Sequence, residues 1–156
     1  MTVPNAAISE ALSLLPPRLD TPAARVTMVA IGLQESRFLY RRQLRGPARG
    51  FWQFERGGGV IGVLSHPASR PLAAVLCADR QVDYTSAAVY ERLEHDDVLA
   101  AGFARLLLWT DRRPIPPAGA SEAAWSYYLD LWRPGKPHPQ TWPGLYARAL
   151  VETEEQ

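Results

Sequence analysis

Two scarcities in this 156-residue chain each exclude a class of protein. Cys77 is the only cysteine, so no disulfide can form within the chain and nothing points to an oxidising compartment. Its apolar, helix-forming surroundings predict a packed thiol rather than a nucleophile. No apolar run approaches the roughly 18 residues that a membrane-spanning helix needs, so we expect no membrane partner.

An excess of charge is missing as well. The 17 Lys and Arg against 16 Asp and Glu leave a net charge of +1, which gives no electrostatic reason to expect nucleic acid as a partner. Lys136 is the only lysine, and we attribute this preference for arginine to a GC-rich coding sequence. The N-terminal segment has no basic stretch before its first apolar residues, so we expect no signal peptide.

Metal and phosphate motifs are also lacking. His66, His95 and His138 lie far apart in the sequence, and none forms a ligand pair at helical or zinc-finger spacing. The glycines at 57–59 lack the Gly-Lys-Ser/Thr of a phosphate-binding loop, so they predict a hinge or turn. We therefore expect neither a metal nor a cofactor.

What remains is the composition of a globular protein, with 47% hydrophobic and 21% charged residues. Capping residues followed by apolar positions at helical spacing recur along the chain, and most prolines lie between these segments. The pattern predicts an all-α fold, a single compact domain over 1–156 with about eight short helices. The expected helices are Ala6–Leu15, Pro22–Ser36, Val60–Leu64, Ala68–Arg80, Thr85–Glu94, Asp96–Trp109, Glu122–Trp132 and Trp142–Val151, with Ser121 and Thr141 capping the last two and a short element at Phe51–Glu55.

Glu35 ends the second of these helices, which is otherwise apolar and begins at Thr21-Pro22. A carboxylate there faces the negative end of the helix dipole, and nearby Phe38 and Trp52 would desolvate it. Both effects raise its pKa, and a carboxyl protonated near neutral pH can donate a proton to a glycosidic oxygen. The alternative is a solvated glutamate that pairs with Arg37 or Arg41.

The surrounding motifs resemble the soluble lytic transglycosylases of the lysozyme-like superfamily. Glu35-Ser36 matches the family's catalytic Glu-Ser pair, and Gly50-Phe51-Trp52-Gln53 matches its Gly-x-x-Gln segment. The family also places a tyrosine near the catalytic carboxyl. In this chain the counterpart is either Tyr127 or Tyr128, and the sequence does not decide between them. The resemblance implies a lysozyme-like domain in which Ser36, Trp52, Gln53 and a tyrosine line the sugar cleft, with Trp52 stacking on a sugar ring. The family's Asn-Ala-Gly after the tyrosine is replaced, with Leu129-Asp130 following Tyr128.

The implied substrate is peptidoglycan, cut between N-acetylmuramic acid and N-acetylglucosamine. Glu35 would act as acid and then as base, giving an anhydro product. A hydrolytic muramidase would need a second carboxylate. Glu55 is the nearest candidate for it, although a surface glutamate paired with Arg49 or Arg56 is the alternative.

A protein of another class also fits. The chain resembles small phage proteins, so a non-catalytic virion component that retains a lysozyme-like fold, such as a tail or head–tail connection protein, is the second hypothesis. Either protein would be found in a phage virion, or in the host cytoplasm before delivery to the cell wall. Other virion proteins are therefore possible partners beside peptidoglycan.

Five arginines lie between residues 37 and 49, beside the proposed cleft. Like charges repel one another, so this segment would gain from an anionic partner. Carboxylates of peptidoglycan, an acidic protein surface and solvent alone are the three alternatives.

Overall fold

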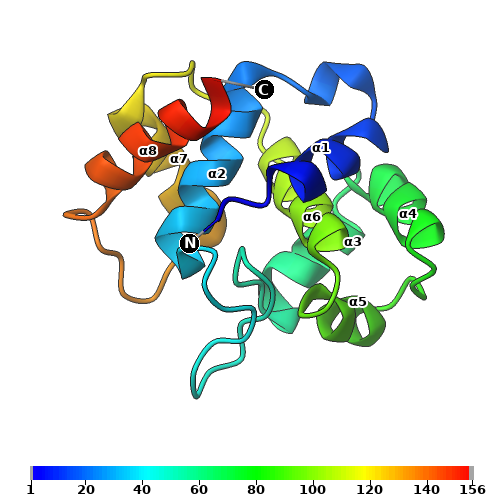
Figure 1. The fold of residues 1–156 in the computed structure, drawn as a ribbon. Coiled ribbons are helices and arrows are strands. Elements are labelled where there is room, and N and C mark those ends of the chain that lie inside the picture. Colours follow the sequence, from blue (N-terminus) through cyan, green and yellow to red (C-terminus); the bar gives the residue numbers. More distant parts are fainter. Residues whose placement is uncertain (1, 155–156) are drawn as a thin grey trace.

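Helices build the architecture in the computed structural model, which describes residues 2–154 (Figure 1). Within these residues no strand forms, and only isolated bridges join Arg42 to Arg49 and Arg49 to Phe54. The predicted all-α class is therefore confirmed. The elements are α1 (Asn5–Ser13), η1 (Pro17–Leu19), α2 (Pro22–Ser36), η2 (Arg56–Val60), α3 (Ile61–Ser65), α4 (Arg70–Asp79), α5 (Ser86–Leu93), α6 (Asp97–Trp109), α7 (Ser121–Trp132) and α8 (Trp142–Glu154).

Two helices form the centre of the domain, α2 and α6. Every residue of α6 from Val98 to Leu108 is buried, and α2 is buried from Val26 to Leu33. Helix α8 packs along α2 with α7 beside it, while α1, α3, α4 and α5 contact α6 (Figure 1). The buried side chains make one continuous core, as a single domain requires.

Side chains cap both central helices: α2 begins where predicted, and α6 begins one residue later than predicted, because Asp96 is its cap. Thr21 Oγ1 accepts a hydrogen bond from Ala24 N at 3.1 Å, with Pro22 in the first helical position. Asp96 Oδ1 accepts one from Leu99 N at 3.0 Å and so begins α6. These caps satisfy amide groups that the first helical turn leaves without partners.

Other local predictions are met only in part. Ser121 is the first residue of α7 rather than its cap, and no side-chain hydrogen bond caps that helix. The hydroxyl of Thr141 contacts Gln34 and the His138 carbonyl. The short element predicted at Phe51–Glu55 consists of a turn at 51–53 followed by the isolated bridge at Phe54. The glycines of η2 form a helical turn broken at Gly58, where φ is −107° and ψ is −105°.

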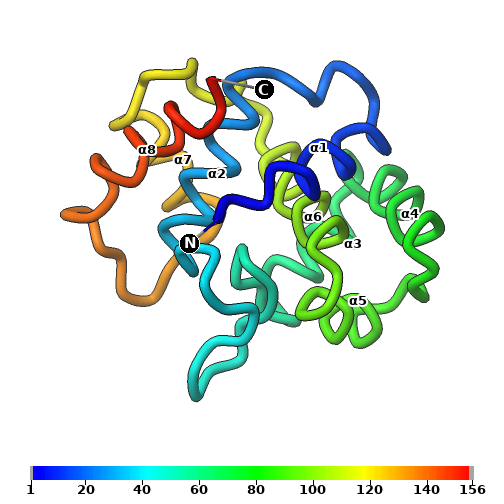
Figure 2. The backbone as a smooth tube through the Cα atoms, in the orientation of Figure 1, coloured from blue at the N-terminus to red at the C-terminus, as the bar shows by residue number. Residues whose placement is uncertain are grey.

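The segment between α2 and η2 projects from the helical body as a long excursion of the chain (Figure 2). It begins where Arg37 and Phe38 both adopt positive φ, at 57° and 54°. The Phe38 ring then folds back over Gly32, where an added Cβ would lie 2.1 Å from the ring. A side chain at position 32 would displace the ring, so glycine there lets the turn after Glu35 pack closely against α2.

Cys77 is buried in α4, and burial raises the pKa of its thiol to about 11. This agrees with the packed thiol that the sequence predicts. Among residues 2–154, no single helix is long and apolar enough to cross a membrane. Arg56–Ser65 and Arg70–Asp79 meet the length and composition criteria only when taken together, across a bend of 104°.

Candidate active site

Glu35 lies in the last turn of α2, and its side chain meets α7. The Tyr128 hydroxyl donates a hydrogen bond to Glu35 Oε1 at 2.7 Å, across 93 residues of sequence. Tyr127 points elsewhere: its hydroxyl donates to the Leu108 carbonyl at 3.0 Å. Of the two candidate tyrosines, Tyr128 is therefore the one beside the carboxyl.

Tyr128 is held in a cluster of aromatic rings. Its ring stacks on Trp142 of α8, with centroids 5.4 Å apart and planes 9° from parallel. Trp125 and Trp132, one turn before and one turn after it on α7, also contact the ring. Tyr128 is 2% exposed, so its hydroxyl position is fixed by packing on three sides.

Burial determines the charge state of this pair. Loss of solvent raises the pKa of Glu35 to about 7, although the hydrogen bond from Tyr128 acts in the opposite direction. Burial and the negative charge of Glu35 both raise the pKa of Tyr128, so the tyrosine keeps its proton. Among residues 2–154, no cation forms an ion pair with Glu35, and its pairing with Arg37 or Arg41 is not observed.

The predicted dipole effect at Glu35 is countered by other donors. The Tyr40 hydroxyl donates to the Glu35 carbonyl at 2.9 Å, and Arg37 Nη1 donates to the carbonyls of Leu33 and Gln34. These donors satisfy the free carbonyls at the end of α2 and reduce the negative field there. Desolvation is thus the main cause of the raised pKa.

Gln34 connects the end of α2 to the segment before α8. Its Nε2 donates to the His138 carbonyl at 3.1 Å, and its Oε1 accepts from the Thr141 hydroxyl at 3.0 Å. The sequence did not identify Gln34, Tyr40 or Thr141 as site residues. Their contacts span five to 107 residues, and no local pattern marks them.

Two residues predicted to bind substrate are structural instead. Ser36 is fully buried, and its hydroxyl donates to the Phe51 carbonyl at 2.7 Å and accepts from Phe38 N at 3.1 Å. Trp52 is 1% exposed, and its Nε1 donates to the Met28 carbonyl at 2.8 Å. Trp52 therefore cannot stack on a sugar, and Ser36 fastens the Gly50–Gln53 turn to α2.

Gln53 lies on that turn with a positive φ of 54° and a partly exposed side chain. Its Nε2 donates to the Gly50 carbonyl at 2.8 Å. Trp132 Nε1 donates to the Trp52 carbonyl at 2.9 Å, which ties the same turn to α7. The turn that carries Gln53 is thus bonded to both helices that hold Glu35 and Tyr128.

Glu55 is exposed and lies beyond this junction. It lines a surface pocket with Arg56, Gly57, Tyr90 and others, and among the described residues it forms no ion pair with Arg49 or Arg56. Arg49 instead donates to the carbonyls of Gly46 and Ala48. The predicted second carboxylate therefore has no contact that connects it to Glu35.

The arginine-rich segment finds its acidic partners within the chain. Arg41 forms two hydrogen bonds to Asp97, both 2.8 Å, and its guanidinium lies 4.2 Å from the Phe51 ring centroid. Arg42 pairs in the same way with Glu94, at 2.7 and 2.9 Å. The premise that these charges need an external anion is wrong for these two residues, because Glu94, directly after α5, and Asp97, at the start of α6, supply the carboxylates.

Comparison with known proteins adds no relative: no family model matches the chain, and no curated protein or solved structure matches it. Within residues 2–154, no cluster of three or more His, Cys, Asp or Glu side chains could hold a metal ion. The site thus consists of a desolvated carboxyl, a tyrosine that donates to it, and a surrounding group of aromatic rings.

Proposed function

We propose that this protein is a peptidoglycan-cleaving glycosidase, of the lytic transglycosylase or lysozyme type, with Glu35 as its general acid and base. The observation that carries the proposal is the state of Glu35. Its carboxyl has a pKa of about 7, is held by Tyr128, and has no ion-pair partner among the described residues. A carboxyl with this pKa can both give and take a proton near neutral pH.

The proposed reaction begins when protonated Glu35 donates its proton to the glycosidic oxygen as the bond to the anomeric carbon breaks. The substrate's own acetamido group stabilises the positive carbon. Glu35, now ionised, then takes the proton of the muramoyl 6-hydroxyl, whose oxygen closes on the anomeric carbon to give an anhydro sugar. The Tyr128 hydroxyl occupies Oε1, which leaves Oε2 to carry the transferred proton.

This route needs one carboxyl, and that agrees with the surroundings of Glu35. A hydrolytic route uses a second acid to activate water or to attack the sugar. The hydrogen-bond partner of the Glu35 carboxyl is a tyrosine rather than an acid, and Glu55 lies on an exposed turn. Partly exposed Trp125 and Trp132 provide apolar ring surface beside Tyr128, and we assign sugar packing to them in place of Trp52.

Purified sacculi incubated with the natural chain and with two variants test the proposal. Glu35→Gln keeps the size of the side chain but removes its exchangeable proton, so soluble fragments should fall about 100- to 10,000-fold. Glu55→Gln is the matched control and should cleave at the natural rate. Mass spectrometry of the fragments should find anhydro ends. Equal release by the natural chain and Glu35→Gln would refute the assignment.

A non-catalytic virion protein is the second candidate, and one observation favours it. Asp130 occupies the region where the family pattern has Asn-Ala-Gly, and it is bound to Arg113 Nη2 at 3.0 Å. This departure from the family pattern, next to the tyrosine that contacts Glu35, is what favours a chain without catalysis. If the natural chain releases no fragments at any pH while its fold is intact, this candidate replaces the enzyme.

A further inference from the structure

A second site lies around the C-terminal end of α6, where a surface pocket of about 610 Å³ opens. Most of its wall is apolar and includes Pro67, Leu108, Trp109 and Ile115. Its volume falls within the range of small-molecule pockets, about 300–1,000 Å³. The pocket includes Tyr127, whereas the neighbouring Tyr128 contacts Glu35, so the two sites use different residues of α7.

Arg105 is the buried cation of this pocket. It is 3% exposed, and its Nε donates to the Leu19 carbonyl at 2.8 Å. Its Nη1 is buried and has no hydrogen-bond partner among residues 2–154. Burial lowers the pKa of Arg105 to about 10, so the group is still cationic at neutral pH. A buried, incompletely paired charge is costly to a fold, and an anion would offset that cost.

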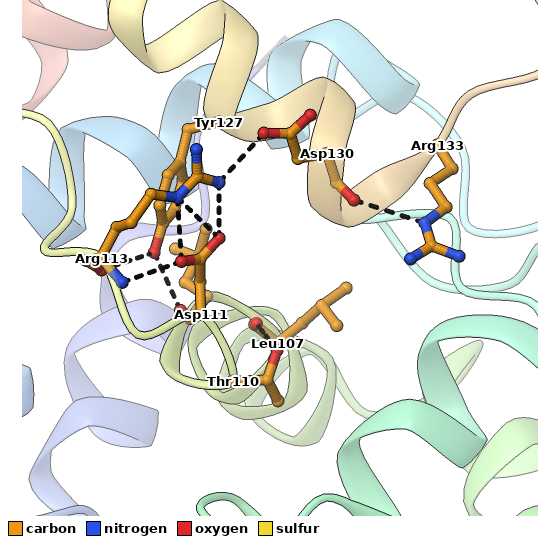
Figure 3. Close-up of polar contacts among 8 residues, drawn as sticks. Leu107, Thr110, Asp111, Arg113, Tyr127, Asp130 and Arg133 are labelled. Atoms are coloured by element: carbon orange, nitrogen blue, oxygen red, sulfur yellow. Dashed lines mark hydrogen bonds and ion pairs between the residues drawn. The ribbon is translucent and has the colours of Figure 1, made fainter.

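The acids around the pocket are already engaged. Arg113 lies between Asp111 and Asp130 and bonds to both, as Figure 3 shows. Asp20 offsets the positive charge of Arg105 only from a distance, because the Asp20 carboxylate accepts two hydrogen bonds from Arg25. Exposed Arg112 also lines the pocket and forms no ion pair within residues 2–154. Positive charge is therefore left in excess.

We propose that this pocket binds a small molecule that carries a carboxylate on an apolar body. A guanidinium donates to a carboxylate with favourable planar geometry, and the apolar wall would cover the rest of the ligand. Trp109 can report on binding, because the guanidinium of Arg105 lies 5.7 Å from the centroid of the Trp109 ring. The proposal is independent of cleavage at Glu35.

The test uses the full chain labelled with nitrogen-15, with the indole N–H of Trp109 assigned by a Trp109→Phe variant. Three probes are titrated: 3-phenylpropanoate, its neutral amide 3-phenylpropanamide, and inorganic phosphate. The carboxylate should shift the Trp109 signal. The amide should bind at least about tenfold more weakly, because it cannot form the charged hydrogen bond that the carboxylate forms. Phosphate should also bind more weakly, because it leaves the apolar wall uncovered.

Arg105→Met keeps the volume of the side chain and removes its charge, so it should abolish the difference between acid and amide. Glu35→Gln is the control and should bind 3-phenylpropanoate as the natural chain does. Equal binding of acid and amide, or no shift with either, overturns the proposal. Tighter binding of phosphate than of 3-phenylpropanoate overturns the apolar part. If Arg105→Met does not fold, the comparison of acid with amide on the natural chain decides alone.

Discussion

The Glu35 site and the arginine-rich segment place charged residues in opposite situations. Arg41 and Arg42 are exposed. Each donates two hydrogen bonds to a carboxylate that neutralises its charge. Glu35 is largely withdrawn from water and is given a tyrosine instead of a cation. The exposed pairs keep their ordinary charges, while the buried carboxyl has a pKa near neutrality. A carboxyl that can exchange a proton near neutral pH thus arises where no cation pairs with it.

The largest expected effect is the dependence of folding stability on the ionisation of Glu35. The pKa of Glu35 is about 7 in the fold against an ordinary 4.5, so folding favours its protonated form. The stability this provides is complete below about pH 4.5 and is lost as the pH rises through 7. Glu35→Gln has no titrating group at position 35. Between pH 4.5 and pH 8, the free energy of unfolding of the natural chain should therefore fall by about 3 kcal/mol relative to that of Glu35→Gln.

Urea unfolding at both pH values measures this difference. A constant difference between the two proteins across the range would mean that Glu35 titrates normally. If the free energy of unfolding of the natural chain rose with pH relative to that of Glu35→Gln, the fold would stabilise the ionised form of Glu35 instead.

Tyr128→Phe removes the hydrogen bond that the Glu35 carboxyl accepts from α7. The hydroxyl stabilises ionised Glu35, so its loss should raise the pKa of Glu35 by about one unit. Carbon-13 NMR of labelled glutamate follows the titration. Tyr127→Phe is the matched control and should leave the Glu35 pKa unchanged, because its hydroxyl contacts the Leu108 carbonyl. A fall in the pKa on Tyr128→Phe would contradict the arrangement.

The smallest effect is expected in the arginine-rich segment. Arg41→Gln removes an ion pair whose arginine side chain is 47% exposed, so the loss in unfolding free energy should stay below about 1 kcal/mol and shrink with salt. Arg45→Gln, which breaks no ion pair among the described residues, is the control. A loss of several kcal/mol for Arg41→Gln would show that this pair behaves as a buried one.

Most of the fold was predictable because helix signals are local. Thr21-Pro22 marks the start of α2 correctly and Asp96 marks the start of α6 to within one residue, because both signals act within one turn. Ser121 was misplaced by one position because a serine can precede a helix or begin it, and only the backbone geometry decides between the two.

The site was less predictable because it depends on how helices face one another. Adjacent residues on a helix point about 100° apart, so choosing Tyr128 over Tyr127 requires the orientation of α7 against α2. Trp52 was assigned to a sugar because its motif adjoins Glu35, yet its ring is 1% exposed. The acids that neutralise Arg41 and Arg42 lie 56 and 52 residues away, and no spacing rule connects them.

The role proposed for Glu35 predicts how sacculus cleavage by the natural chain depends on pH. If Glu35 is the general acid, only its protonated form starts the reaction, so the rate should fall as the pH rises through about 7. Soluble fragments should be scored from pH 5 to pH 9, with Glu35→Gln as the baseline at each pH. A rate well above that baseline with a decline near pH 7 is the predicted result. A rate that is unchanged between pH 6 and pH 9, or that never exceeds the baseline, would contradict the account.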